Sequence, residues 1–434
     1  MPNAPLFARG VKVSDLELNH EILDKCDWDM EKFFELHRGT TAGHGSEFRP
    51  SSRLGVVVGQ HPHFDYLREM LEEGFDYRLT RELSEEDRVA EFEAQLSRGN
   101  HQSAVAEQEE VTTMLAGDVT RGFVLPISAQ NLRRLKRVHL QPCGIVKQHS
   151  LQGDGTRKLK SRLTHDLSFW ILFKEAAINA RVDLDNHPPM VYGWCLDRLL
   201  HYIVCLRFRN PGVRIYIAKF DYSDAYKRIS HRPRAAAATV IVVGGVAYIH
   251  LRMAFGGSPN PAAFSCFSEM LTDLGNELGM AEYIPGVDDG QPEDRVDPPK
   301  KYDFDEMTPV AKAILPAVVV DTESGSFRDC FIDDVIDCHL GTERNLRRGG
   351  KIVPLAVEVM SRPHAGEDVE PIPRKPLLSP AKLEAEGRSA EVQIVLGWRV
   401  DTRKLIVSLP DDKFVAWSVD LTQVIQQKKG TRKE

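Results

Sequence analysis

FIDDVID, residues 331–337, is the segment from which the expected architecture of this chain follows. It places the adjacent carboxylates of Asp333 and Asp334 between apolar, β-prone pairs, which predicts a tight hairpin with an acidic tip. Two ionised neighbours repel each other, so a bound cation would stabilise such a tip. Asp-Asp is also common in ordinary turns, so this pattern alone fits a plain turn without a bound cation equally well.

A second apolar and acidic segment lies upstream, IYIAKFDYSDAYKRI at residues 215–229. Its first half predicts a strand that ends at Asp221, and helical character resumes from Ser223 to Ile229. We expect Asp221 to supply a third carboxylate to the site of Asp333 and Asp334. Turn or cap chemistry explains any one of these acids, but not the strand context that they share.

Length and composition indicate a globular protein of two or three domains, because the chain has 434 residues, 42% of them hydrophobic and 27% charged. The seven cysteines are scattered without a CxxC pair, which favours a reducing compartment and argues against a disulfide or zinc framework. The start, MPNAPLFARG, lacks the pattern of a signal peptide, and no uncharged apolar run approaches about 18 residues. We therefore expect an intracellular protein without a membrane partner, with nucleus or cytoplasm undetermined.

Charge is distributed unevenly along the chain. The net charge of -7 argues against a nucleic-acid partner, but residues 121–170 hold ten Lys or Arg and only two Asp. Residues 61–110 hold fourteen Asp or Glu and five Arg. Because a basic segment is flanked by acidic ones, the charge pattern still allows a phosphate-bearing partner.

The basic segment contains a predicted hairpin, VHLQPCGIVKQ followed by the turn LQGDGT and then KLKSRLTHDLSF. Lys147 lies on one arm and Arg162 on the other, and we expect both cations on one side. That arrangement suits a triphosphate, because Arg makes bidentate contacts and Lys acts as a point charge. A solvated cationic hairpin without a ligand is the alternative.

The other segments alternate between helical and β-prone patterns. Periodicity predicts helices at residues 29–36, 61–123, 188–208, 262–278, 353–360 and 412–427. Hairpins are expected at Gly244-Gly245 and over residues 391–410, the latter turning at Asp401 to Lys404. Residues 281–325 are acidic and rich in proline, which predicts an exposed insertion, and residues 371–380 resemble a linker.

In this order, the segments resemble the sequence blocks of reverse transcriptases, in particular the polymerase region of eukaryotic retroelements, from about Asn100 onward. Lys147 with RLTHDLS resembles the fingers motifs, and KFDYSDAYKRI resembles the first palm motif. FGGSPNPAAF resembles the second and FIDDVID the third. LGWRVDTRKLIVSLPDDK is similar to the primer-grip hairpin that leads into the thumb.

The resemblance implies an α+β fold, a right-hand polymerase palm and fingers with an antiparallel palm sheet backed by helices. Residues 1–123 would be a mainly helical N-terminal extension. Residues 124–390 would form fingers and palm with the acidic insertion. Residues 391–434 would form the primer-grip hairpin and the start of a truncated thumb, and no RNase H or integrase segment is recognisable.

The resemblance also implies catalytic and metal-binding residues. Two Mg²⁺ ions, with Mn²⁺ as the alternative, would be held by the side chains of Asp221, Asp333 and Asp334 and by the backbone of Phe220 or Tyr222.

Nucleotide-binding residues follow from the same resemblance. Lys147 and Arg162 would bind the triphosphate. Tyr226 would close the sugar pocket and reject a 2′-hydroxyl, although plain core packing is its alternative. Gly257, Ser258 and Pro259 would contact template or nucleotide, with a helix-start turn as the alternative. Met253-Ala254-Phe255 stands where many retroviral relatives carry a Gln-Gly pair, so the contacts there are expected to differ.

The expected function is template-directed DNA synthesis, with a primed RNA or DNA template and deoxynucleoside triphosphates as partners. Protein partners are not indicated. One alternative is a non-catalytic nucleic-acid-binding remnant of a mobile element. The other is an RNA-templated RNA polymerase, which shares the same palm chemistry.

Overall fold

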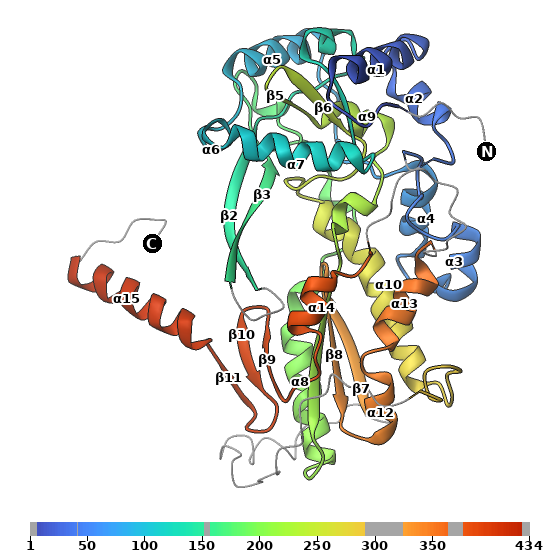
Figure 1. Cartoon of the computed structure of the whole chain (residues 1–434), viewed down its shortest axis with the longest axis vertical. Coiled ribbons are helices and arrows are strands. Elements are labelled where there is room, and N and C mark those ends of the chain that lie inside the picture. Colours follow the sequence, from blue (N-terminus) through green and yellow to red (C-terminus); the bar gives the residue numbers. More distant parts are fainter. Residues whose placement is uncertain (1–6, 41, 152–156, 291–323, 363–375, 428–434) are drawn as a thin grey trace. The chain divides into compact units, whose positions relative to one another are not determined.

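The computed structural model describes residues 7–40, 42–151, 157–290, 324–362 and 376–427 (Figure 1). The chain divides into two compact units. The first comprises Met1–Met190, Asp221–Leu274 and Leu355–Ala385, and the second comprises Val191–Phe220, Gly275–Pro354 and Glu386–Glu434. Most of the expected acidic insertion and the start of the expected linker lie outside the described residues.

Helices dominate the first part of the first unit. They are α1 (Val13–Lys25), α2 (Met30–Leu36), α3 (Ser51–Val58), α4 (Phe64–Glu73), α5 (Glu85–Arg98), α6 (Gln102–Ala106) and α7 (Gln108–Thr120). The helical prediction for residues 61–123 is confirmed except over residues 74–84, which are not helical. Ser84 caps α5 by accepting a hydrogen bond of 3.0 Å from Asp87 N. Periodicity did not predict α1 because its buried face includes Asn19, which donates to the Pro126 carbonyl at 2.8 Å.

A three-stranded antiparallel sheet forms the centre of the first unit, in the order β1 (Val124–Ser128), β6 (Val246–His250) and β5 (Val240–Val243). Gly244 and Gly245 join β5 to β6 with φ values of 59° and 80°, which a two-residue hairpin turn requires and which glycine adopts without strain. This hairpin prediction is confirmed. Residues of α1, α2 and α9 (Pro233–Ala238) share a buried apolar cluster with this sheet, so the N-terminal helices are part of its core.

A two-stranded ribbon belongs to the same unit, β2 (Cys143–Leu151) paired antiparallel with β3 (Arg157–His165), as predicted. Ile145 and Leu163 lie opposite each other and are buried with Val111 and Leu115 of α7. One face of the ribbon is therefore attached to α7.

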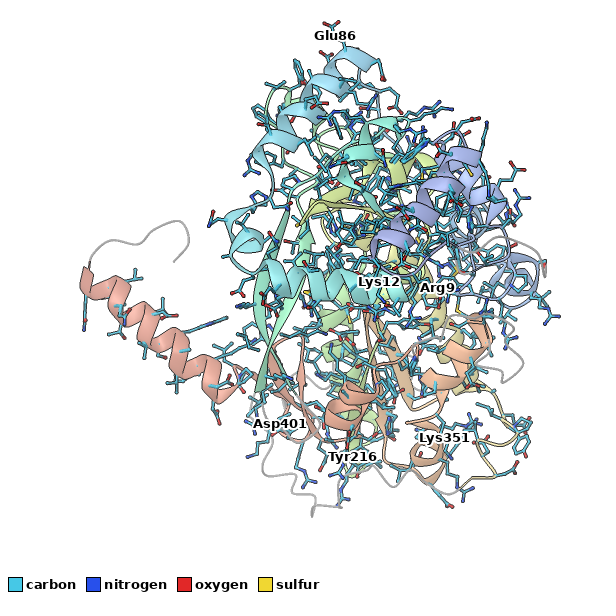
Figure 2. The ribbon with its side chains drawn as sticks, turned by 45° about the horizontal axis from the view of Figure 1, so that its top comes forward. Arg9, Lys12, Glu86, Tyr216, Lys351 and Asp401 are labelled. Carbon is cyan, nitrogen blue, oxygen red and sulfur yellow. The ribbon has the colours of Figure 1, made fainter. Side chains whose placement is uncertain are left out.

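The second unit contains α8 (Cys195–Arg209) and a sheet in the order β4 (Ile215–Asp221), β8 (Asp334–Leu340) and β7 (Ser326–Phe331). Apolar residues of α8, β4 and β8 form its buried core. Tyr216 of β4, labelled in Figure 2, has its ring 5.9 Å from that of His339 on β8. The helix predicted over residues 188–208 starts only at Cys195, and the side chains of Met190 and Trp194 are exposed rather than on the buried face.

Three more helices follow the predicted pattern, α10 (Asn260–Met280), α13 (Ile352–Met360) and α15 (Asp411–Gln427). Two short helices, α12 (Glu343–Arg348) and α14 (Pro380–Glu386), were not predicted. The described parts of both units combine helices with small antiparallel sheets, so the α+β class is confirmed.

The segment of residues 391–410 is a three-stranded meander, not the predicted hairpin. Its strands are β9 (Val392–Val395), β10 (Trp398–Asp401) and β11 (Ile406–Ser408). The predicted turn after Asp401 joins β10 to β11, and the Asp401 carboxylate accepts from the Arg403 and Lys404 amides at 3.0 and 2.9 Å. A second turn, at Leu396-Gly397, has φ values of 47° and 86° and divides the expected first arm.

Candidate functional site

The FIDDVID segment forms the predicted tight hairpin. Phe331 at the end of β7 pairs with Asp334 at the start of β8, which leaves Ile332 and Asp333 as the turn. Ile332 has a φ of 57°, a value that a β-branched residue adopts only under strain. The strained turn keeps Asp333 and Asp334, both partly exposed, next to each other at the tip.

The remaining acid of FIDDVID has a different role. Asp337 is fully buried and pairs with Arg328 Nε at 2.7 Å and with His339 Nδ1 at 2.6 Å. Nearby, Asp329 accepts two hydrogen bonds from Arg198, at 2.6 and 2.7 Å. These pairs neutralise Asp337 and Asp329 along the strands, whereas Asp333 and Asp334 lie at the turn itself.

Asp221 is the last residue of β4, the strand next to β8. Its carboxylate forms an ion pair with Lys382 Nζ of α14, and its carbonyl accepts a hydrogen bond from Ser379 N at 2.9 Å. Residues 377–379 run beside this segment, because Tyr222 forms a β-bridge with Leu378. No local sequence pattern indicates that Lys382 contacts Asp221, since 160 residues separate them.

The three acids belong to different units, Asp221 to the first and Asp333 and Asp334 to the second. Among the residues that the structure describes, no group of three or more His, Cys, Asp or Glu side chains has a geometry that would hold a metal ion. The three-carboxylate metal site therefore remains a prediction.

The Arg228 guanidinium holds the loop that follows Asp221. This guanidinium is 1% exposed and pairs with Glu47 at 2.9 Å, and it also donates to the Ser223 carbonyl at 3.0 Å. Tyr222 is buried against Phe264, and burial raises the pKa of its hydroxyl. Phe220 is buried as well, so a metal contact from Phe220 or Tyr222 would come from the backbone, as expected.

Tyr226 and Arg162, two predicted nucleotide contacts, meet at one aromatic ring. The Tyr226 side chain is 9% exposed and its ring lies 5.1 Å from that of Phe255. Arg162 Cζ lies 5.8 Å from the centre of the same Phe255 ring, within reach of a cation–π contact. Phe255, 39% exposed, was not predicted as a site residue, although it stands in the Met253-Ala254-Phe255 segment where contacts were expected to differ from those of retroviral relatives.

The expectation that Lys147 and Arg162 face one side is wrong. Arg162 lies opposite Val146, and Lys147 lies opposite Ser161. Opposed residues share a face and neighbours alternate, so the two cations project from opposite faces of the ribbon. Lys147 is on the α7 side, where it pairs with Glu107 at 2.5 Å, a hydrogen bond that raises the pKa of Lys147. Lys160 and Lys158, two and four residues before Arg162, lie on the Arg162 face of β3.

The backbone of the loop of Gly257, Ser258 and Pro259 is held by hydrogen bonds to Asn179. Asn179 accepts from Ser258 N at 2.9 Å and donates to the Gly256 carbonyl at 2.8 Å. A Cβ on Gly257 would lie 2.4 Å from Asn260 Oδ1, so a larger residue does not fit there. The predicted turn before α10 is thus confirmed, with Ser258 exposed and Gly257 and Pro259 buried.

Comparisons with known proteins gave structural likenesses only. No protein-family model matches the sequence, and no curated protein matches it. Among solved structures, the chain is similar to a foamy viral protease-reverse transcriptase in complex with double-stranded DNA, with 13% identity, a TM-score of 0.40, and coverage of 85% of this chain and 48% of that one. For the complex with an RNA/DNA hybrid, identity is 11%, the TM-score 0.37, and coverage 84% and 37%.

The native protease-reverse transcriptase of Prototype Foamy Virus matches with 13% identity, a TM-score of 0.36, and coverage of 72% of this chain and 28% of that one. The chain therefore spans less than half the length of these three proteins. Because the TM-scores are low, this likeness carries no argument about the function of the chain.

The length and polarity of the helices decide whether one of them could span a membrane. Within the described ranges, every helix is too short or too polar to cross a bilayer.

Proposed function

We propose that this chain is an RNA-directed DNA polymerase with a palm and fingers, acting by two-metal nucleotidyl transfer. The observation that carries the proposal is the strained β7–β8 turn, which places Asp333 and Asp334 side by side at its tip. Strain of this kind is concentrated at functional sites.

The side chains fit the chemistry of Mg²⁺, which prefers oxygen ligands such as carboxylates. The Asp221 carboxylate already has a cationic partner, the Lys382 ammonium, so this position attracts positive charge. Asp221, Asp333 and Asp334 would hold the ions, with a backbone ligand from Phe220 or Tyr222. Bound Mg²⁺ would supply Lewis-acid activation of the primer 3′-hydroxyl and neutralise charge on the leaving pyrophosphate.

The triphosphate contacts are assigned to Arg162 and Lys160, which share a face of the ribbon, and not to Lys147. Arg162 can make a bidentate contact with phosphate oxygens. Tyr226 and Phe255 would form the wall against the sugar, since their rings are in contact beside Arg162. The fixed loop of Gly257, Ser258 and Pro259 would position the template or base.

A primer-extension assay tests the function. Purified protein with poly(rA)/oligo(dT), Mg²⁺ and dTTP should extend the primer. Nucleic-acid binding without any extension would contradict polymerase activity and favour the remnant of a mobile element. Incorporation of ribonucleotides as efficiently as deoxynucleotides would favour the RNA polymerase.

Removing the Tyr226 ring should weaken sugar discrimination. In Tyr226→Ala, the preference in kcat/KM for dTTP over UTP should fall by about tenfold or more, because a shape-based rejection of one hydroxyl is lost. Tyr226→Phe is the matched control, and it should keep the preference because the ring remains. An unchanged preference in Tyr226→Ala would mean that this ring has only a packing role.

Lys382 should compete with divalent cations for the Asp221 carboxylate. Lys382→Met keeps the length of the side chain and removes its charge, so Mn²⁺ should bind about fivefold more tightly, equivalent to an ion pair of about 1 kcal/mol. Electron paramagnetic resonance of free Mn²⁺ measures this without catalysis. Lys174→Met, at an exposed position, is the control. Equal affinity in wild type and Lys382→Met would contradict the competition.

A further inference from the structure

Helix α15 (Asp411–Gln427) exposes a row of large apolar side chains. Phe414, Trp417, Leu421 and Ile425 are between 51% and 73% exposed. Over the part of the chain that the structure describes, the buried apolar cluster of the second unit includes no residue of α15. The helix therefore presents to solvent the kind of side chains that form cores and interfaces elsewhere.

The spacing of these side chains is that of a seam between two helices. Phe414, Trp417, Leu421 and Val424 follow one another at intervals of three, four and three residues. These are the a and d positions of a heptad, and they lie within an arc of about 80°. A stripe this narrow is typical of a helix that packs along one other helix, whereas a helix that covers a broad core has a wider apolar face.

Packing of this stripe would supply stability that the helix lacks by itself. Seven of its 17 residues are β-branched or aromatic, and such residues have a lower helix propensity than Ala or Leu. Helices of this length are stabilised mainly by packing of one apolar face, because nucleation is costly. At its first turn, Lys413 Nζ donates to the Gly397 carbonyl at 3.3 Å, which anchors the start of the helix but does not cover the stripe.

The charges at the two ends of α15 indicate which partner fits. Its first turn carries Asp411 and Asp412, and the sequence continues after Gln427 with KKGTRKE. An antiparallel pair of such helices would set the acidic end of each copy beside the basic end of the other. A parallel pair would place the two acidic turns together, where they repel each other.

We propose that α15 is a self-association surface, on which α15 of a second copy of this chain packs antiparallel. The stripe is centred midway between Phe414 and Ile425, so a two-fold axis at that point pairs it with itself. Trp417 and Leu421 would then pack nearest the axis, where side chains usually contribute most to affinity. None of the residues assigned above to metal, nucleotide or template contact lies in α15, so its variants test self-association separately from polymerase activity.

Sedimentation equilibrium of the full chain, at a series of protein concentrations, tests the proposal. Wild type should show a monomer–dimer equilibrium. Trp417→Ala should raise the dissociation constant by about 100-fold, because a central aromatic side chain is lost from both copies at once. Adding Leu421→Ala should leave the chain monomeric. Val419→Ala is the matched control, since Val419 is an exposed apolar residue on the other side of the same helix, and it should keep the wild-type constant.

Charge reversal tests the antiparallel orientation. Asp411→Lys and Lys428→Glu should each raise the dissociation constant by about fivefold, and the two changes combined in one chain should restore it. Circular dichroism verifies the fold of every variant. Wild type that stays monomeric at every concentration overturns the proposal, and so does a dimer that Trp417→Ala does not weaken. A monomer whose affinity for fluorescein-labelled poly(rA)/oligo(dT) falls in Trp417→Ala also overturns it, because nucleic acid would then cover the stripe.

Discussion

The variant Asp333→Asn plus Asp334→Asn should lose nucleotide incorporation by at least about 1,000-fold, because both charges proposed to bind metal at the hairpin tip are removed while the shape of the side chains is kept. Its fold should remain intact. Both residues are partly exposed at a turn, where Asn is readily accommodated, and the change also removes a like-charge repulsion. Incorporation of labelled dTTP into oligo(dT) on poly(rA) measures the loss, and thermal unfolding followed by circular dichroism verifies the fold.

A matched substitution separates this effect from a general loss of charge. Asp197→Asn removes one exposed carboxylate of α8 in the same unit and should leave incorporation unchanged. Retained activity in the double variant would remove the metal assignment of Asp333 and Asp334, and with it the polymerase proposal.

The variant Glu47→Gln should destabilise the protein by about 3 to 5 kcal/mol, the usual effect of removing one partner from a buried ion pair. Glu47 is 5% exposed and Arg228 1%, so the variant would remove the carboxylate that pairs with this guanidinium in a place that water does not reach. The same guanidinium holds the carbonyls of Ser223 and Pro376. A shift of the urea unfolding midpoint measures the effect.

An exposed ion pair provides the comparison. Glu93→Gln breaks the contact of Glu93 with Arg133 at 2.7 Å, where both side chains are about half exposed, and should cost less than about 1 kcal/mol. Equal, small shifts for Glu47→Gln and Glu93→Gln would show that the loop after Asp221 does not depend on the Arg228 contact. A large shift for Glu47→Gln alone is the expected result.

Local sequence patterns predicted most of the elements that carry the candidate site. The β7–β8 hairpin, β4 ending at Asp221 and the turn before α10 were all expected, because alternation, turn residues and helical spacing act over a few neighbouring residues. The Gly244-Gly245 hairpin was predicted for the same reason. Patterns failed where a polar residue takes a core position, as Asn19 does in α1, or where a second turn divides a strand, as at Leu396-Gly397.

Contacts between distant segments could not be predicted in this way. Nothing in the sequence near Lys382 indicates Asp221, because this pair is formed by backbone pairing between segments far apart in the chain. The error over Lys147 has a related cause. A hairpin was expected correctly, but which side chains share a face depends on strand register, and a shift of one residue reverses every side chain.

Residue order alone established the α+β class, the positions of the acids relative to strand ends, and the resemblance to reverse transcriptases, since each depends on short-range spacing. Tertiary structure decided which groups surround each of these charges. It neutralised Asp337 and Asp329, and paired Asp221 with Lys382 and Lys147 with Glu107. The reason is that the effect of a charge depends on its neighbours in space, and those neighbours are set by packing and register between segments that the chain itself keeps apart.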